Sequence, residues 1–205
     1  PFNTMTAAAS AAQANQVIYV HPGSPTGSTL LKTGQRLQGA GEAFTFGGLT
    51  IAAGAPPSLG STVTLADGAV VRALTVNAGG SASVVGANLS GVESLVSVNI
   101  TGGGTGLSLT NVGGTFSMSG GAISGVGAGG GVAVSGGNGT LTIASPVTSA
   151  SGHSVSVQNR TGGTVTFSSA ITDTGTGVLL NANTGATVTF TGGVAVTTSG
   201  VPAFT

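Results

Sequence analysis

A repeat of roughly 23 to 25 residues in the second half of the chain constrains its fold more than any other feature. Four segments align without gaps on Thr115, Thr140, Thr164 and Thr187: 114–118, 139–143, 163–167 and 186–190. A second series precedes them at 106–109, 131–134, 154–157 and 177–180, and Val201 is predicted to begin a fifth copy. Because two series keep nearly the same spacing, they indicate a repeat architecture.

Apolar and hydroxyl residues alternate within each copy, which is the period of a β-strand. Two apolar columns are predicted to face inward: Phe116, Leu141, Val165 and Val188, and then Met118, Ile143, Phe167 and Phe190. The hydroxyl residues between them, including Thr166 and Thr189, are predicted to face outward. A third short strand in each copy is indicated at 122–123, 146–147, 170–171 and 194–195.

Three short strands and three turns in about 23 residues predict one coil of a right-handed, single-stranded parallel β-helix. Gly and Asn residues fill the turns, and both tolerate the positive φ of a sharp corner. A leucine-rich or tetratricopeptide solenoid is the alternative, but no helical period follows the first fifteen residues. We therefore predict an all-β solenoid with roughly 23 to 25 residues per coil.

The two ends of the chain differ from the repeat. Residues 1–15 are predicted to form an N-terminal capping helix, with Asn3 or Thr4 as its N-cap. The β-helix is predicted over 16–205, with three to four coils in 49–100, where the strands are harder to align. Because 201–205 read as an unfinished strand, we expect the β-helix to continue in a larger protein or to self-associate through its open ends.

Composition and charge exclude several classes of function. The 205 residues include four Lys and Arg against four Asp and Glu, so no basic patch for a nucleic acid is expected. No run of about 18 apolar residues occurs, so this segment is not expected to insert into a membrane. The chain has no Cys, which excludes disulfides and thiolate metal sites.

The acidic residues are too scattered to predict a catalytic site. A glycoside hydrolase needs two carboxyl groups across the scissile bond. Asp67 and Asp173 lie in turns several coils apart, and Glu42 and Glu93 are equally isolated, so all four are predicted to be turn or surface acids. Arg72 precedes Glu93 by close to one coil, and the two are candidates for an exposed ion pair.

Metal and nucleophile motifs are also incomplete. His21 and His153 lie over a hundred residues apart, with no acid in register. Residues 136–140 match the start of a calcium-binding nonapeptide, but Leu141 stands where its Asp should be. The position one coil after His153 falls three residues beyond Asp173, which argues against a Ser–His–Asp arrangement. No catalytic, cofactor-binding or metal-binding residue is therefore predicted.

A ladder of outward threonines is the most regular surface that the sequence predicts. Regular hydroxyl groups on a flat face are typical of ice-binding solenoids, although a β-branched residue is also simply favourable on a strand. The ladder consists of Thr140, Thr142, Thr164, Thr166, Thr187 and Thr189.

Several segments resemble a known family. Residues 1–4 with the Ala-rich segment after them, followed by 17–23, resemble the capped first coil of bacterial pectin-lyase-like β-helix proteins, and 31–41 and 62–76 continue the likeness. The Gly-Thr-x-Thr coils look like those of bacterial surface or secreted proteins with autotransporter-like passengers. The resemblance implies an extracellular or cell-surface location, but this superfamily includes lyases, hydrolases, adhesins and inert stalks.

We therefore expect a non-catalytic structural or adhesive segment of an exported or cell-surface bacterial protein. Its near-zero net charge favours self-assembly, and glycans are further expected partners. The alternatives are a carbohydrate-active enzyme, a carbohydrate-binding module and, more remotely, an ice-binding solenoid. No cofactor is expected.

Overall fold

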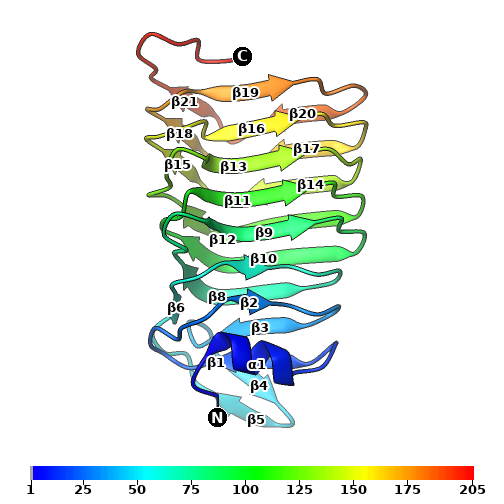
Figure 1. Ribbon diagram of the computed structural model, residues 1–205, viewed down its shortest axis with the longest axis vertical. Helices are drawn as coiled ribbons and strands as arrows, with labels where there is room; N and C mark the ends of the chain where they lie inside the picture. Colours follow the sequence, from blue (N-terminus) through cyan, green and yellow to red (C-terminus); the bar gives the residue numbers. More distant parts are fainter. Residues whose placement is uncertain (1) are drawn as a thin grey trace.

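The predicted apolar columns stack in register in one parallel sheet. This is seen in the computed structural model, which describes residues 2–205 (Figure 1). Phe116 pairs with Leu141, and the same column continues through Val165 and Val188. The side chains of both columns are fully buried except those of Val188 and Phe190 in the last coil, which are half-buried. The predicted parallel β-solenoid, its inward columns and its coil length are confirmed.

The sheet that carries these columns, here called the threonine sheet, has one long strand in each of eight successive coils. These strands are β1 (Val17–Val20), β3 (Arg36–Gly39), β8 (Val70–Val76), β10 (Val92–Ile100), β12 (Thr115–Ile123), β14 (Thr140–Ala144), β17 (Thr164–Phe167) and β20 (Thr187–Phe190). Four short strands belong to the same sheet beside these long strands: β6 (Ser58–Leu59), β15 (Val147–Ser149), β18 (Ile171–Asp173) and β21 (Val194–Val196). The last three confirm the third strand predicted in each repeat.

A second parallel sheet, here called the front sheet, faces the viewer in Figure 1. Its strands are β2 (Thr29–Leu30), β7 (Val63–Thr64), β9 (Ala82–Ala87), β11 (Thr105–Thr110), β13 (Gly130–Ser135), β16 (Val155–Gln158) and β19 (Val178–Asn181). The second predicted series is in register here, since Leu107 pairs with Val132 and Val132 with Val155. Buried residues of the two sheets form one continuous core along the axis.

Residues with positive φ form the corners between the strands. Asn88, Asn111 and Asn159 have φ of 54°, 52° and 56° at the end of the front sheet, as the Asn-rich turns predict. The Asn111 Nδ2 atom donates a hydrogen bond to Asn88 Oδ1 at 2.8 Å, so side chains of successive corners also stack. Corners therefore hold neighbouring coils together as well as turning the chain.

A short helix forms the first layer at the N-terminal end. The helix α1 (Met5–Ala11) begins at Thr4, whose hydroxyl accepts a hydrogen bond from the Ala7 amide at 3.2 Å, so Thr4 and not Asn3 is the N-cap. Met5, Ala8 and Ala9 are buried in the core. The Lys32 ammonium binds the Ser10 carbonyl at 2.8 Å, near the end of the helix. The predicted N-terminal helix is confirmed, although it spans Met5–Ala11 and not the whole of 1–15, and Pro1 lies outside the described residues.

The prediction for residues 49–100 is wrong in two respects. Residues 49–51 belong to an antiparallel hairpin, β4 (Phe44–Phe46) and β5 (Leu49–Ile51), which lies at the bottom of Figure 1 and outside the coils. Gly47 and Gly48, both with positive φ, make its two-residue turn. The threonine sheet contains only two long strands in this range, β8 and β10. Alternation alone does not distinguish a hairpin strand from a coil strand, which explains the error.

The predicted fifth copy at Val201 is also wrong. Phe204 forms the parallel bridge with Val178, and the Leu180 amide donates to the Thr205 carbonyl at 2.7 Å. The preceding turn is longer than in earlier coils and is closed by a hydrogen bond from the Thr198 hydroxyl to the Val201 carbonyl at 2.6 Å. The longer turn shifts the register by three residues.

Candidate functional site

Asp67 is a turn acid, as predicted, and it binds the next coil. Its carboxylate accepts hydrogen bonds from the Ser90 amide and the Ser90 hydroxyl, both at 2.7 Å. The hydrogen bond from the Ser90 amide lowers the pKa of Asp67 most, and the bond from the Ser90 hydroxyl lowers it further. Both carboxylate oxygens are therefore engaged in holding a turn.

Glu93 is fully buried, so its prediction as a surface acid that pairs with Arg72 is wrong. It pairs in register with Phe116 and therefore points inward in that column. One of its oxygens accepts a hydrogen bond from the Gly68 amide at 2.9 Å. Burial raises the pKa of Glu93, and the nearby Asp67 carboxylate raises it further. The spacing to Arg72 is close to one coil, but the phase of the strand places Glu93 on the opposite face.

Asp173 is also buried, at 1% exposure, so its prediction as a surface acid is wrong too. Its carboxylate accepts hydrogen bonds from the amides of Ser154, Gly175 and Gly177 at 2.6, 2.7 and 3.1 Å. The Asp173 carboxylate thus reaches Ser154, the residue after His153. The strand register argued against this contact, but the Asp173 side chain is long enough to make up for the difference in backbone position. Within residues 2–205, however, the buried Ser154 hydroxyl and His153 Nδ1 have no hydrogen-bond partner, so no proton relay connects them.

Arg160 is a buried cation that the sequence did not reveal as special. Its guanidinium donates hydrogen bonds to the carbonyls of Gly136 at 2.9 Å, Val112 at 3.4 Å and Gly162 at 3.3 Å, and to that of Gly139. Burial lowers the pKa of Arg160. The side chain therefore ties turns of three coils together. In the sequence, this buried role is indicated only by the position of Arg160 as a single charged residue between Gly-rich turns.

The titratable residues do not gather into a metal site. Within residues 2–205, no group of three or more His, Asp or Glu side chains could hold a metal ion. His21 follows β1 and His153 precedes β16, in coils far apart along the axis.

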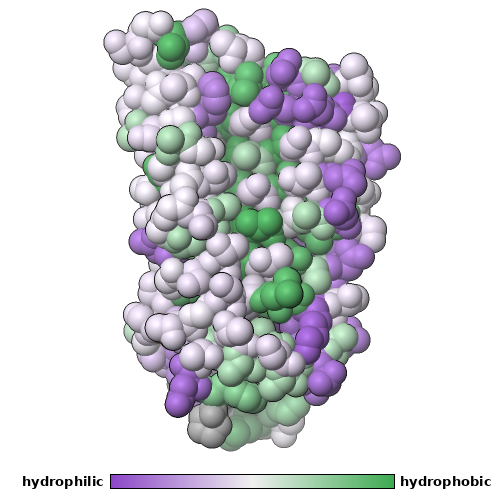
Figure 2. Space-filling model, in the orientation of Figure 1, coloured by the Kyte–Doolittle hydropathy of each residue, from purple (hydrophilic) through white to green (hydrophobic). Residues whose placement is uncertain are grey.

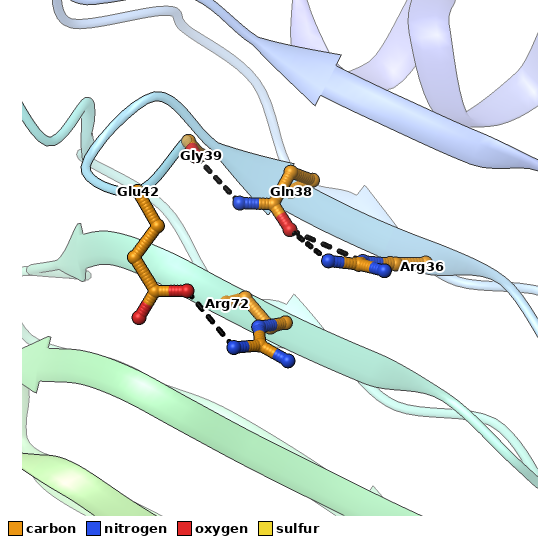
Figure 3. A network of polar contacts seen from close by, with 5 residues as sticks. All are labelled: Arg36, Gln38, Gly39, Glu42 and Arg72. Atoms are coloured by element: carbon orange, nitrogen blue, oxygen red, sulfur yellow. Dashed lines mark hydrogen bonds and ion pairs between the residues drawn. The ribbon is translucent and has the colours of Figure 1, made fainter. Parts of the chain in front are cut away.

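A cluster of half-buried charges lies on the outer face of the threonine sheet near the N-terminal end (Figure 3). Arg36 and Gln38 lie on β3, Arg72 on the neighbouring strand β8, and Glu42 in the loop after β3. Arg72 Nη2 lies 2.9 Å from Glu42 Oε2, and Arg36 Nε donates to Gln38 Oε1 at 3.1 Å. Sequence reasoning missed this ion pair because the partners lie 30 residues apart, across the hairpin.

Aromatic residues border the same cluster. The Tyr19 and Phe44 rings are stacked with centroids 5.6 Å apart, and Phe46 lies 6.4 Å beyond Phe44. The Arg36 guanidinium lies over the Phe44 ring, 5.4 Å from its centroid. We call Arg36, Arg72, Glu42, Tyr19, Phe44 and Phe46 the N-terminal patch.

The N-terminal patch carries two cations and one anion. A hydrogen bond from the Ser97 hydroxyl, together with Arg72, lowers the pKa of Glu42. The guanidiniums of Arg36 and Arg72 lie on the neighbouring strands β3 and β8 (Figure 3), and burial and the charge of Arg72 lower the pKa of Arg36. Arg36 is hydrogen-bonded to the neutral amide of Gln38, whereas the ion pair joins Arg72 and Glu42, so the patch has one positive charge in excess. Such a site can bind a carboxylate.

The predicted threonine ladder faces outward, as expected. Thr140, Thr164 and Thr187 are aligned and exposed, whereas Thr142, Thr166 and Thr189 are aligned and half-buried. Two parallel columns of hydroxyl groups therefore cover this end of the threonine sheet.

The outer face of the front sheet is different, with an apolar stripe along its middle (Figure 2). Leu30 is 65% exposed there, and Val85, Ala133 and Leu179 occupy the equivalent outward position in later coils. Small hydroxyl residues separate them, so the stripe contains no titratable group among the described residues.

No helix within residues 2–205 is long and apolar enough to cross a membrane. The chain matches no protein-family model, no curated protein and no solved structure at a significant level.

Proposed function

We propose that the chain is a non-catalytic structural and adhesive segment of an exported or cell-surface bacterial protein of the pectin-lyase-like kind. One observation carries this proposal: five of the eight charged side chains bind backbone groups of the chain itself. They are Lys32, Asp67, Glu93, Arg160 and Asp173. Acids that already hold turns are poorly placed to protonate a substrate or to activate water.

The shape of the fold supports a role as a spacer. Each coil packs on its neighbours through a continuous core, so the length of the rod grows with the number of coils while its width stays constant. Few charged groups interrupt its faces. A rod of this kind holds a binding surface away from the point where it is attached.

Self-association through the ends is part of the proposal. Among the described strands, β1 and β20 are the outermost members of the threonine sheet, and each has one edge without a paired strand. An unpaired edge presents amide and carbonyl groups to a further strand. Sedimentation at increasing protein concentration tests this, and a constant sedimentation coefficient would contradict it.

The experiment that tests the non-catalytic role is a cleavage assay on acidic and neutral polysaccharides. We expect no turnover, and we expect D67N, E93Q and D173N to alter thermal stability only. Turnover by the wild-type chain that any one of these changes abolishes would instead support the alternative, a carbohydrate-active enzyme.

Ice binding is a second candidate, favoured only by the aligned threonine columns. A flat hydroxyl array supports it, but β-branched residues also suit exposed strands for reasons of packing. Thermal hysteresis in the wild-type chain that Thr164→Tyr abolishes would support it, and its absence would exclude it.

A further inference from the structure

We propose that the N-terminal patch docks a segment of another protein that presents a carboxylate beside apolar side chains. The patch combines partly exposed charges with aromatic side chains, in a chain with only 4% charged and 4% aromatic residues. The inference gives the adhesive part of the proposed function its partner and rests on it.

Charge complementarity supplies the first reason. Arg72 is paired with Glu42 at 2.9 Å, whereas Arg36 donates to the neutral Gln38 amide and lies over Phe44. Two guanidiniums and one carboxylate leave one positive charge. Arg36 Nε and Nη2 both donate to Gln38 Oε1, so an incoming carboxylate neutralises the excess charge by binding the remaining N–H groups of the guanidinium.

The apolar surroundings supply the second reason. Phe46 is 72% exposed and Leu49 is 70% exposed, and they flank the turn of the β4–β5 hairpin, whose Phe44 ring lies against the Arg36 guanidinium. Phe, Tyr and Arg side chains gathered in one place at a surface are typical of the cores of protein–protein interfaces.

The geometry favours a peptide segment over a sugar. The Phe44 ring is stacked on Tyr19 and flanked by Phe46, and it is only 8% exposed, so a sugar ring cannot stack on it. The exposed apolar groups are an aromatic ring and a branched aliphatic side chain at the ends of a hairpin turn. Such a pair suits the irregular surface of peptide side chains.

A second copy of this chain is a poor source of the carboxylate. Glu93 and Asp173 are buried, and Glu42 is already paired within the patch. Asp67 is held by the Ser90 amide and hydroxyl. The side-chain carboxylates of residues 2–205 are thus all engaged or buried, and the partner is a different protein.

The probe is a library of short random peptides displayed on phage and selected on the immobilised full chain. Counter-selection uses the R36Q/R72Q double variant, which removes both charges. We expect the selected peptides to combine Asp or Glu with aromatic or aliphatic residues. Failure to enrich any peptide, or enrichment of peptides that lack an acidic residue, would overturn the proposal.

A selected peptide is then titrated against single variants by fluorescence anisotropy. We expect R36Q to weaken binding about tenfold, because a charge-assisted hydrogen bond is lost. R36K should weaken it less, and E42Q should strengthen it because a competing carboxylate is removed. T166S, on the same sheet but several coils away, is the matched control and should bind as the wild type does.

Other outcomes separate this inference from the function on which it rests. Thermal unfolding of each variant shows whether a loss of binding reflects a loss of fold, and peptides that bind R36Q as well as the wild type overturn the site. An alginate oligosaccharide that displaces the peptide and binds more tightly would overturn the peptide proposal and make the patch a glycan site instead. Polysaccharide turnover would overturn the non-catalytic role while leaving arginine-dependent peptide binding intact.

Discussion

The buried Glu93 carboxylate accepts a hydrogen bond from the Gly68 amide at 2.9 Å, one coil below it. The bond is reciprocated, because Asp67, the residue before Gly68, accepts a bond from the Ser90 amide at 2.7 Å in the coil of Glu93. Two acids of adjacent coils thus hold each other's turns. Their environments differ, since burial raises the pKa of Glu93 whereas hydrogen bonds lower that of Asp67.

This difference predicts opposite pH dependences for the two acids. Because the folded chain holds the Glu93 proton more tightly than the unfolded chain, Glu93 stabilises the fold at low pH, and that contribution is lost as pH rises through its raised pKa. E93Q resembles the protonated acid and keeps an acceptor for the Gly68 amide. We expect it to be about 1–3 kcal/mol more stable than the wild type at pH 8 and equal to it near pH 4.

D67N is the matched control for this prediction. Since the pKa of Asp67 is lowered on folding, its contribution is present above the unfolded pKa and is lost as pH falls through the folded value. D67N should therefore destabilise the chain at neutral pH and lose its effect in acid. Urea unfolding across this pH range measures both variants, and an E93Q curve parallel to that of the wild type would contradict the account of Glu93.

Arg160 predicts a large effect from a single buried cation. Its guanidinium binds carbonyls in three coils and has no carboxylate partner among the described side chains. R160M would remove this donor from all these carbonyls, of which that of Val112 keeps a bond from the Gly139 amide, and we expect a loss of about 3 kcal/mol in the free energy of unfolding. R160K should recover part of it, because an ammonium cannot reach all the carbonyls at once.

Hydrogen exchange can locate the effect of R160M. The Gly139 and Thr161 amides, which bind the Val112 and Gly137 carbonyls at 2.9 and 3.2 Å, should lose protection, while the amides around β3 should keep theirs. A uniform loss of protection along the rod would show that Arg160 acts on global stability and not as a local tie.

Phe167 and Thr166 test the winding of the coil with adjacent residues. Phe167 is 1% exposed and stacks on Phe190 with centroids 5.1 Å apart and ring planes 10° apart, whereas Thr166 faces outward. F167A should cost about 3–5 kcal/mol, as for other buried Phe residues, and T166A should cost about 0.5 kcal/mol or less. Thermal unfolding compares them, and equal effects would contradict the inward phase of the strand.

The sequence predicted those features that depend on period and phase within a regular repeat. The inward columns from Phe116 to Phe190 repeat at nearly constant spacing, so their register needed no knowledge of the turns. Arg72 and Glu42 show where this reasoning ends. Their pairing depends on a hairpin inserted between β3 and β8, which makes the step from Arg36 to its partner Val70 much longer than a regular coil.

Side-chain reach explains the remaining errors. Asp173 lies too far from the Ser154 position by backbone register, yet its carboxylate binds the Ser154 amide at 2.6 Å. Acids usually lie on the surface, which explains the prediction for Glu93, although its position in the Phe116 column argued for the interior. Where residue type and strand phase disagreed in this repeat, strand phase indicated the correct face.

Two glycines with similar positive φ test how much of the stability comes from close packing of the corners. Gly163 and Gly79 have φ of 73° and 62°, so Ala is strained by a similar amount at both, about 1 kcal/mol. A Cβ at Gly163 would lie 2.2 Å from both the Asn138 and Gly139 carbonyl oxygens of the preceding coil, whereas a Cβ at Gly79 would meet no heavy atom within 4 Å. We expect G163A to cost at least about 2 kcal/mol more than G79A, because the backbone of two coils must separate. Urea unfolding of the two variants measures the difference, and equal costs would mean that neighbouring coils have room to separate at this corner.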